Sequence, residues 1–407
     1  MMRKRLISLL LITVVVLLAG LLLTQRQQAD SGQGGADGPL IAGLAEQLNA
    51  VTGLKVTAAE GKLVADLAKR DGGWVVANHH DYPADMGKVR EYLIKLSESK
   101  VREVKTSKPE NYARLGVEDL GSAVAKGLGV ELAGLKAPAK LIVGISAGTG
   151  SPGTFVRRDG EAQSLLVSGD LIPEKEGSNW MAKEIIDLPS SEVLAVAVTA
   201  PDKSVLKIDK QDPNAFNYTV YNLPKGRQLS SDSAGNLIAG SLAGLTLEDV
   251  SPAADAPVDD KTAWTATYVS YSGLVADATL WGEGEKSWLR VAARVDQATL
   301  DAWVSREQSK AEAERASAEA AAKAAEAAKA AEAPKADGAS ADAAKAAEPP
   351  ALPAPFDAAK AKADKRAELD KRVAEINAKA GPWTYAIPSW KAANIKKKID
   401  DLLQPKG

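Results

Sequence analysis

The chain has 407 residues, no cysteine, two histidines and a formal net charge of −2 at pH 7. The absence of cysteine excludes disulfides, thiolate metal sites and cysteine nucleophiles, and the near-neutral charge provides no basic field to attract nucleic acid. The length predicts two or three domains. We therefore expect no catalytic residue, no cofactor, no metal site and no nucleic-acid partner.

The first residues predict a membrane anchor. Arg3, Lys4 and Arg5 precede an uncharged run from Leu6 to Leu23, which at ~1.5 Å per residue crosses most of a ~30 Å hydrocarbon core. Because basic residues stay on the cytoplasmic side, we expect a cytoplasmic tail at 1–5 and a transmembrane helix at 6–24. A cleaved signal peptide is the alternative, but its apolar region is usually ~7–15 residues long and ends in a small-x-small site.

The next segment begins a pattern that occurs twice. Residues 25–38 are Gly-rich and typical of a flexible linker. The first module, 39–189, is predicted to contain a hairpin, a proline loop, a helix with Val89, Leu93 and Leu96 on one face, and an antiparallel meander. The strands are predicted at 54–57, 62–69, 74–77, 101–105, 140–143, 154–157 and 164–167.

The second module, 190–295, follows the same order. A helix carrying Leu237, Leu242 and Leu245 is predicted between its two groups of strands. The strands are predicted at 193–199, 204–209, 216–220, 265–271, 275–281 and 286–293. Short strands with one helix per module predict an α+β fold, in which tandem repeats of antiparallel sheet each have a helix on one face.

A fragment of the pattern returns at 381–407. An aromatic strand and a proline are followed there by a helix with Ile395, Ile399 and Leu402. This fragment either completes the second module or begins a truncated third. Aromatic residues stand at matching positions of the repeats, which favours structural roles in core packing. Asp85 is expected to cap the helix that follows it. The repeat-signature residues are Trp74, Tyr82, Pro83, Asp85, Phe216, Pro224, Trp383 and Pro388.

Residues 296–380 differ from both modules in composition. Residues 296–333 are dominated by alanine, glutamate and lysine, as in semi-rigid helical spacers, and a Pro-rich break is expected near 334–355. Helix is expected again at 356–380. This Ala/Lys/Glu arm is either a solvated insertion or a partner-docking element, folded back as a hairpin or standing out from the modules.

Two short motifs imitate catalytic or nucleotide sites. Residues 144–148 match the G-x-S-x-G elbow of serine hydrolases around Ser146, but both histidines precede it and no helix is expected after it. Residues 148–153 match G-x-G-x-x-G, which binds a pyrophosphate by opening a helix. Here an extended segment follows, so we expect a hairpin loop.

The remaining polar candidates favour ordinary roles. His79 and His80 point to opposite faces if the chain is extended, so a surface loop is expected instead of a metal site. Asp81 and Asp85 could form an acid/base pair, although capping by Asp85 is the simpler interpretation. The basic run 396–398 is expected to be a solvated helix face.

The order of motifs resembles a bacterial family called "domain of unknown function 4340". The resemblance is carried by Trp74–Val76, by Tyr82–Asp85, by Thr106–Val117 with Phe155–Arg157, and by the terminal Trp383–Pro388. It covers most of 40–295 and the last segment, but not the Ala-rich arm. Such proteins look like membrane-anchored extracytoplasmic partners of gliding-motility-type ABC transporters, and the family supplies no catalytic residues.

These observations predict a non-catalytic accessory or scaffold subunit of an ABC-type envelope transport system. The resemblance implies an ABC permease and ATPase as partners, besides the inner membrane and other envelope proteins, with the bulk of the chain periplasmic. The first alternative is a periplasm-spanning structural linker built on the Ala-rich arm. The second is an envelope hydrolase using Asp81 and Asp85.

Overall fold

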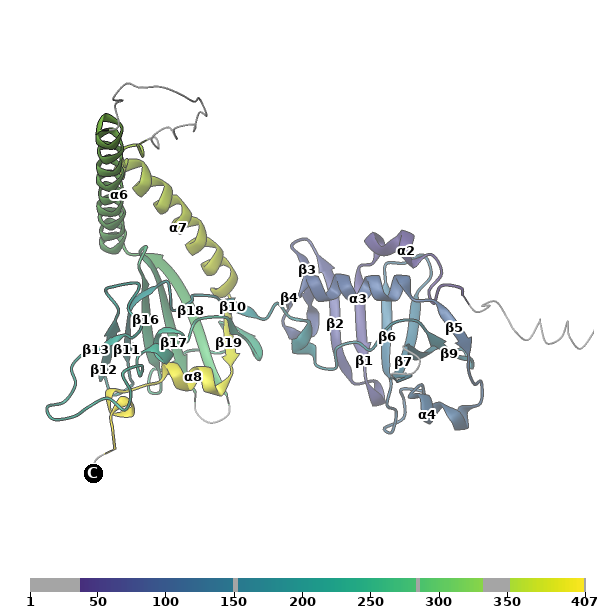
Figure 1. Ribbon diagram of the computed structural model, residues 1–407. Coiled ribbons are helices and arrows are strands. Elements are labelled where there is room, and N and C mark those ends of the chain that lie inside the picture. The colour runs from purple at the N-terminus through teal and green to yellow at the C-terminus, as the bar shows by residue number, and fades with distance from the viewer. Residues whose placement is uncertain (1–36, 149–152, 283–285, 332–351, 406–407) are drawn as a thin grey trace, which may run out of the picture. The chain divides into compact units, whose positions relative to one another are not determined.

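The computed structural model describes residues 37–148, 153–282, 286–331 and 352–405 (Figure 1). The predicted anchor Leu6–Leu23, most of the predicted linker and most of the Pro-rich break lie outside the described residues. Within the described ranges, none of the helices combines the length and apolar character needed to span a bilayer. The chain divides into two compact units, Met1–Lys183 and Glu184–Gly407. Both combine helices with a large antiparallel sheet, which confirms the α+β class.

Unit 1 is built on a nine-stranded sheet with the order β4-β3-β2-β1-β6-β7-β8-β9-β5. Helix α3 (Met86–Glu98) lies across this sheet and buries Val89, Tyr92, Leu93 and Leu96, as its apolar spacing predicts (Figure 1). Two shorter helices are α2 (Leu44–Gln47) and α4 (Tyr112–Leu115). The strands are β1 (Gly53–Thr57), β2 (Leu63–Arg70), β3 (Gly73–Val76), β4 (Tyr82–Pro83), β5 (Val101–Val104), β6 (Leu128–Ala133), β7 (Ala139–Ser146), β8 (Thr154–Arg158) and β9 (Ser164–Val167).

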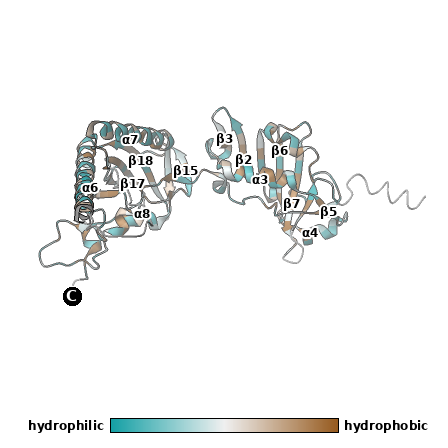
Figure 2. Ribbon diagram, turned by 45° about the horizontal axis from the view of Figure 1, so that its top comes forward, coloured by the Kyte–Doolittle hydropathy of each residue, from teal (hydrophilic) through white to brown (hydrophobic). Residues whose placement is uncertain are grey.

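Unit 2 contains an eight-stranded sheet with the order β13-β12-β11-β16-β17-β18-β19-β15, and a separate pair of β10 with β14. Its helices are α5 (Asn236–Ala239), α6 (Gln297–Ala331), α7 (Ala358–Ala380) and α8 (Ser389–Ile395). Its strands are β10 (Glu184–Ile186), β11 (Val193–Thr199), β12 (Val205–Asp209), β13 (Thr219–Val220), β14 (Leu245–Thr246), β15 (Asp249–Pro252), β16 (Trp264–Ser270), β17 (Leu274–Trp281), β18 (Ser287–Val295) and β19 (Trp383–Ile387). Figure 2 shows hydrophobic colours on the central strands β7 and β17 and many hydrophilic residues on α7.

The two large sheets have corresponding strand orders. The two-residue β4 has no counterpart and is set aside. Strands β1–β3 then correspond to β11–β13, strand β5 corresponds to β15, and strands β6–β9 correspond to β16–β19. The C-terminal strand β19 therefore lies inside the second sheet, between β18 and β15, and completes it. In unit 1, residues 159–163 join β8 to β9, whereas in unit 2 the same connection contains α6 and α7. The arm thus takes the place of a hairpin turn.

This correspondence corrects the predicted alignment of the meanders. Strand β7 corresponds to β17 and not to β16, because β6 was not predicted and every later match moved by one strand. The correspondence also shows that Trp383, on β19, and Trp74, on β3, do not occupy matching positions of the repeat, contrary to the prediction. Leu128, Val130 and Leu132 alternate as in a strand, but the glycines at 127, 129 and 134 make the stretch resemble a loop. A Cβ at Gly129 would lie 2.4 Å from Thr57 Oγ1 and 2.6 Å from Leu120 Cδ1.

The predicted helix of the second module is much shorter than expected. Helix α5 contains four residues and ends before Gly240. Leu237 is 65% exposed, and Leu245 belongs to β14, where it pairs with Ile186. Glycines at 235, 240 and 244 lower the helix propensity of this stretch, so sheet pairing prevails over helix extension.

Candidate functional site

The base of the arm is fixed to the sheet of unit 2 at the start of α6. The Asp296 carboxylate accepts a hydrogen bond from Thr299 N at 2.7 Å, and hydrogen bonds from the side chain and the backbone of Thr299 lower the pKa of Asp296. Leu300 is fully buried, and Gly273, with a φ of +98°, lets the chain pass close to it. Arg306 lies over the Tyr271 ring at 5.7 Å from its centroid. The first turns of α6 are therefore part of the core.

Helix α7 returns along the sheet and completes an open strand edge. Strand β19 pairs with β18 only as far as Leu289, which leaves the later residues of β18 without a strand partner on that side. The Asn377 side chain accepts from Ala293 N at 2.7 Å and donates to Ala293 O at 2.8 Å. Arg372 pairs with Glu192 at 2.7 Å, and Leu369 is 1% exposed. A side-chain amide of α7 thus replaces one residue of a neighbouring strand.

Replacing Asn377 by alanine is expected to lower the free energy of unfolding by about 2 kcal/mol, because the buried N–H and C=O of Ala293 lose their partner. Urea unfolding of the full chain measures the change. Lys371→Ala is the control, because this lysine lies on the same helix with a side chain 79% exposed. Equal midpoints for the two variants would contradict the edge-completing role.

The first turns of α6 contact the first two turns of α7. Lys362 pairs with Asp301 at 2.7 Å, which lowers the pKa of Asp301, and Lys365 lies over the Trp303 ring at 5.1 Å. Beyond Val304, α6 contains no apolar side chain larger than alanine up to its end at Ala331. The outer part of α6 therefore contributes no large apolar side chain to the core of unit 2.

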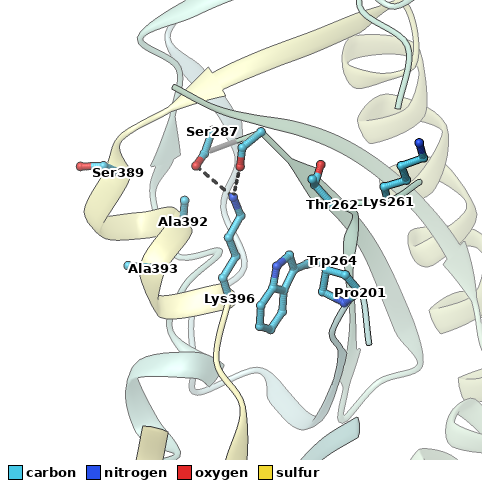
Figure 3. A pocket seen from close by; sticks show the side chains of 10 residues that line it. Pro201, Lys261, Thr262, Trp264, Ser287, Ser389, Ala392, Ala393 and Lys396 are labelled. Carbon is cyan, nitrogen blue, oxygen red and sulfur yellow. Dashed lines mark hydrogen bonds between the residues drawn. The ribbon is translucent and has the colours of Figure 1, made fainter. Parts of the chain in front are cut away.

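A cavity of about 450 Å³ lies beside α8 in unit 2, within the usual range of ligand pockets, ~300–1,000 Å³. Figure 3 shows the Trp264 indole facing Lys396 across the cavity, with Ala392 and Ala393 on the α8 wall and the Ser389 hydroxyl pointing away. The described lining residues include neither a carboxylate nor a histidine. The polar groups that line it include the amines of Lys261 and Lys396 and the hydroxyls of Thr262 and Ser287.

Three lysines in and after α8 bind other segments of unit 2, and one of them, Lys396, lines the cavity. Lys396 Nζ donates to Gly282 O at 2.8 Å and to Ser287 Oγ at 3.2 Å, so it joins the end of α8 to the start of β18. Lys391 Nζ donates to the carbonyls of Ser241 and Ala243, and burial lowers its pKa. Lys398 pairs with Asp202 at 2.5 Å. The prediction of a solvated helix face at 396–398 is wrong, because these residues follow the end of α8 and are half-buried, and Lys396 and Lys398 bind neighbouring segments.

The serine and glycine motifs lie on a hairpin in unit 1. Ser146 ends β7, is exposed, and pairs with Thr154 of the antiparallel β8. Gly148 and Gly153 flank the connection between these two strands, so no helix opens after the glycine run. Gly144 is closely packed, because a Cβ there would lie 2.1 Å from Leu115 O. The expectation of a hairpin loop is confirmed.

The histidine and aspartate candidates form a turn and a helix cap. His80 and Asp81 have left-handed φ angles of 59° and 56°, and Asp81 pairs with Arg70 at 3.6 Å on the surface. His79 ends a short 3₁₀ helix, Ala77–His79. The Asp85 side chain accepts from Gly87 N and Lys88 N at 2.9 and 3.1 Å, which confirms the predicted cap. Among the described residues no group of three or more potential ligands could hold a metal ion.

Asp85→Ala is expected to lower the free energy of unfolding by about 1 kcal/mol, because two N–H groups of α3 lose their acceptor. Asp85→Ser keeps an oxygen acceptor and should stay within roughly 0.5 kcal/mol of the parent. Thermal unfolding followed by circular dichroism distinguishes the two. A serine variant as unstable as the alanine variant would show that capping is not the role of Asp85.

The repeat-signature residues do not share one environment. Trp74 and Tyr82 are buried, whereas Trp383 and Pro388 are half-buried and Pro83 and Pro224 are exposed. Phe216 is 86% exposed, so its predicted place in the core is wrong. Tyr218 takes the inward position instead, with its hydroxyl donating to Ser190 O and Val193 O at 2.7 Å each. Phe216 precedes β13 in a turn, where Asn236 binds its carbonyl.

A buried arginine, which the sequence named only as part of the Phe155–Arg157 segment, joins two of the motifs in unit 1. Arg157, on β8, is 4% exposed and lies over the Tyr112 ring at 4.7 Å. Its Nε donates to Val117 O at 2.9 Å, and it pairs with Asp119. The segment around Tyr112 thus packs on the strand that contains Phe155 and Arg157. Strand β8 ends in two adjacent arginines, and of these only Arg157 is buried.

Residues 74–263 match a family described as "Domain of unknown function (DUF4340)". The match begins in β3, ends before β16, and includes the segments around Tyr82, Tyr112 and Arg157, whereas Trp383 and Pro388 lie outside it. It supports the predicted resemblance over these residues. Comparisons with curated proteins and with solved structures found no match.

Proposed function

We propose that the chain is a non-catalytic, membrane-anchored accessory or scaffold subunit of an ABC-type envelope transport system. Leu6–Leu23 forms the single-pass anchor, with residues 1–5 in the cytoplasm and both units outside. The partners are an ABC permease and ATPase, with further envelope proteins as possible ligands of the two units. The family match over 74–263 supports this context, because the resemblance implies extracytoplasmic partners of ABC transporters.

The observation that carries the proposal is the arm inserted in place of a hairpin turn. Helix α6 has 35 residues and extends ~52 Å at ~1.5 Å per residue. Its base is held by Leu300, Asp296 and the return of α7, whereas its outer part contributes nothing large to the core. A stiff extension on a firm base suits a subunit that reaches another protein.

The two alternatives have less support. A periplasm-spanning linker needs a helix that separates folded parts, but α6 and α7 leave and rejoin adjacent strands of one sheet, β18 and β19. An envelope hydrolase would use Asp81 and Asp85. The side chain of Asp85 caps α3, and Asp81 pairs with Arg70 at the surface.

Affinity purification of the tagged full-length protein from mild-detergent membranes tests the proposal, with mass spectrometry of the recovered proteins. We expect an ABC permease and ATPase with the full chain. A variant with Ser309–Pro355 replaced by a short Gly-Ser linker keeps Leu300, Trp303, Val304 and α7, and should lose most of that recovery. Its unfolding midpoint controls for misfolding.

Two results would overturn parts of the proposal. If ABC components never accompany the full chain, the transporter assignment fails. If the shortened arm recovers them as well as the full arm does, the arm is a solvated insertion and the contact lies elsewhere.

A further inference from the structure

The described chain enters unit 1 along one particular sheet edge. Asp37 N donates to Val101 O at 2.7 Å, and Val101 N donates to Gly38 O at 2.8 Å. Pro39 forms an isolated antiparallel bridge with Lys100. Strand β5 is the terminal strand of the sheet, so residues 37–39 cover part of its outer edge. The start of the folded unit is therefore fixed to β5.

The length of the preceding chain limits how far this edge lies from the proposed anchor. Asp37 is fourteen residues after Leu23, which allows at most ~50 Å when fully extended. The nine-stranded sheet is ~38 Å wide at ~4.8 Å per strand. The β5 edge is thus tethered near the bilayer, and the β4 edge is not.

The segment at this edge is cationic in a chain that is otherwise slightly acidic. Lys100–Lys105, at this edge, contains three cationic residues and one carboxylate, and the following Thr106–Arg114, which runs on toward β8, adds two cationic residues and one carboxylate, whereas the whole chain has a net charge of −2. Lys100, Lys108 and Arg114 are exposed, and Val104 is 49% exposed. Lys105 is paired with Glu103 at 2.6 Å. Exposed cations beside an exposed apolar residue suit a surface of anionic headgroups.

We propose that unit 1 rests on the membrane that holds the anchor with its β5 edge and the segment that follows it, Lys100–Arg114, and that these residues bind anionic lipid headgroups. This inference rests on the proposed membrane anchor and adds an orientation to it. The short tether supplies a high local concentration, so weak headgroup contacts suffice to hold this edge down. The contact orients unit 1 with its β4 edge away from the bilayer.

The absence of cysteine makes a direct distance measurement possible. Val104→Cys places a donor fluorophore at the β5 edge, and Asp71→Cys places it in the exposed β2–β3 turn near the opposite edge. Each full-length variant is reconstituted into vesicles of phosphatidylcholine, alone or mixed with phosphatidylglycerol, that contain an acceptor-labelled lipid. Flotation of the vesicles at alkaline pH reports the anchor separately.

We expect energy transfer from position 104 to be roughly threefold higher than from position 71 on the anionic vesicles. It should fall in 1 M salt, where the screening length shortens from ~10 Å to ~3 Å. Neutralising Lys100, Lys105, Lys108 and Arg114 to glutamine should remove the dependence on lipid charge. Neutralising four exposed cations elsewhere, Lys207, Lys225, Lys360 and Lys371, should leave it unchanged.

The outcomes separate this inference from the proposed function. If the chain does not float with the vesicles, both the anchor and the lipid contact fail. If it floats but transfer from position 104 equals that from position 71, or does not depend on lipid charge, the contact is overturned and the anchored subunit stands. The proposed contact would also be overturned if neutralising the four control lysines in unit 2 and the arm changed the energy transfer from position 104.

Discussion

Gly144→Ala is expected to lower the free energy of unfolding of unit 1 by about 3 kcal/mol or more. A Cβ at this position would lie 2.1 Å from Leu115 O, 2.9 Å from Val117 Cγ1 and 3.0 Å from Gly116 O. Two of these atoms are backbone oxygens at the end of α4, so a rotamer change cannot relieve the contact. The backbone of β7 or of residues 115–117 must move.

Urea unfolding of the full chain measures this effect, with two matched controls. Gly72→Ala lies in a turn where nothing approaches the new Cβ within 4 Å, so it should change the midpoint little. Ser146→Ala, in the same G-x-S-x-G motif, removes an exposed hydroxyl and should be close to neutral. A stable Gly144→Ala variant would show that β7 and α4 are not packed as closely as described.

This result would also explain why the motif resembles a serine-hydrolase elbow. In that elbow the glycines permit a tight turn that exposes the serine. Here Gly144 allows the segment 115–117 to lie on β7, and Ser146 is an ordinary strand-end residue. The sequence pattern is shared, but the close approach that requires glycine comes from a segment about thirty residues earlier. Only the tertiary structure distinguishes the two cases.

Local pattern predicted most strands and the long helices. The hairpin β2–β3 has strong alternation and a Gly-containing turn, and α3 has a regular apolar face. The arm helices follow from alanine, glutamate and lysine, whose helix propensity is high without any tertiary contact. In these segments local preference and final structure agree.

The failures occur where tertiary contacts override local preference. Strand β6 contains Gly129, which is required by Thr57 on the neighbouring β1 and is therefore explained only once the strands are paired. The return of α7 to the sheet depends on Asn377 and Ala293, which are 84 residues apart in sequence. The exposure of Phe216 depends on Tyr218 taking the buried position. No short-range pattern contains these facts.

Arg157→Leu is the second large effect we expect, with a loss of about 3 kcal/mol in the unfolding of unit 1. Leucine removes the donors to Val117 O and Glu161 O, both at 2.9 Å, and the ion pair with Asp119. Val117 is fully buried, so its carbonyl would lose a charged donor without access to water. The stacking of the guanidinium on Tyr112 is lost as well.

The argument for Arg157 depends on its fork geometry, and this makes the prediction specific. Arg157→Lys keeps the positive charge but cannot bind Val117 O and Glu161 O in the same directions, so we expect it to recover less than half of the loss. Arg70→Leu removes a surface pair at 3.6 Å with a side chain 54% exposed, and should cost under ~1 kcal/mol. If Arg157→Lys is as stable as the parent chain, charge alone holds the Tyr112 segment on β8. If Arg157→Leu is also neutral, the segment is held by the apolar cluster of Tyr112, Val117 and Ile142 instead.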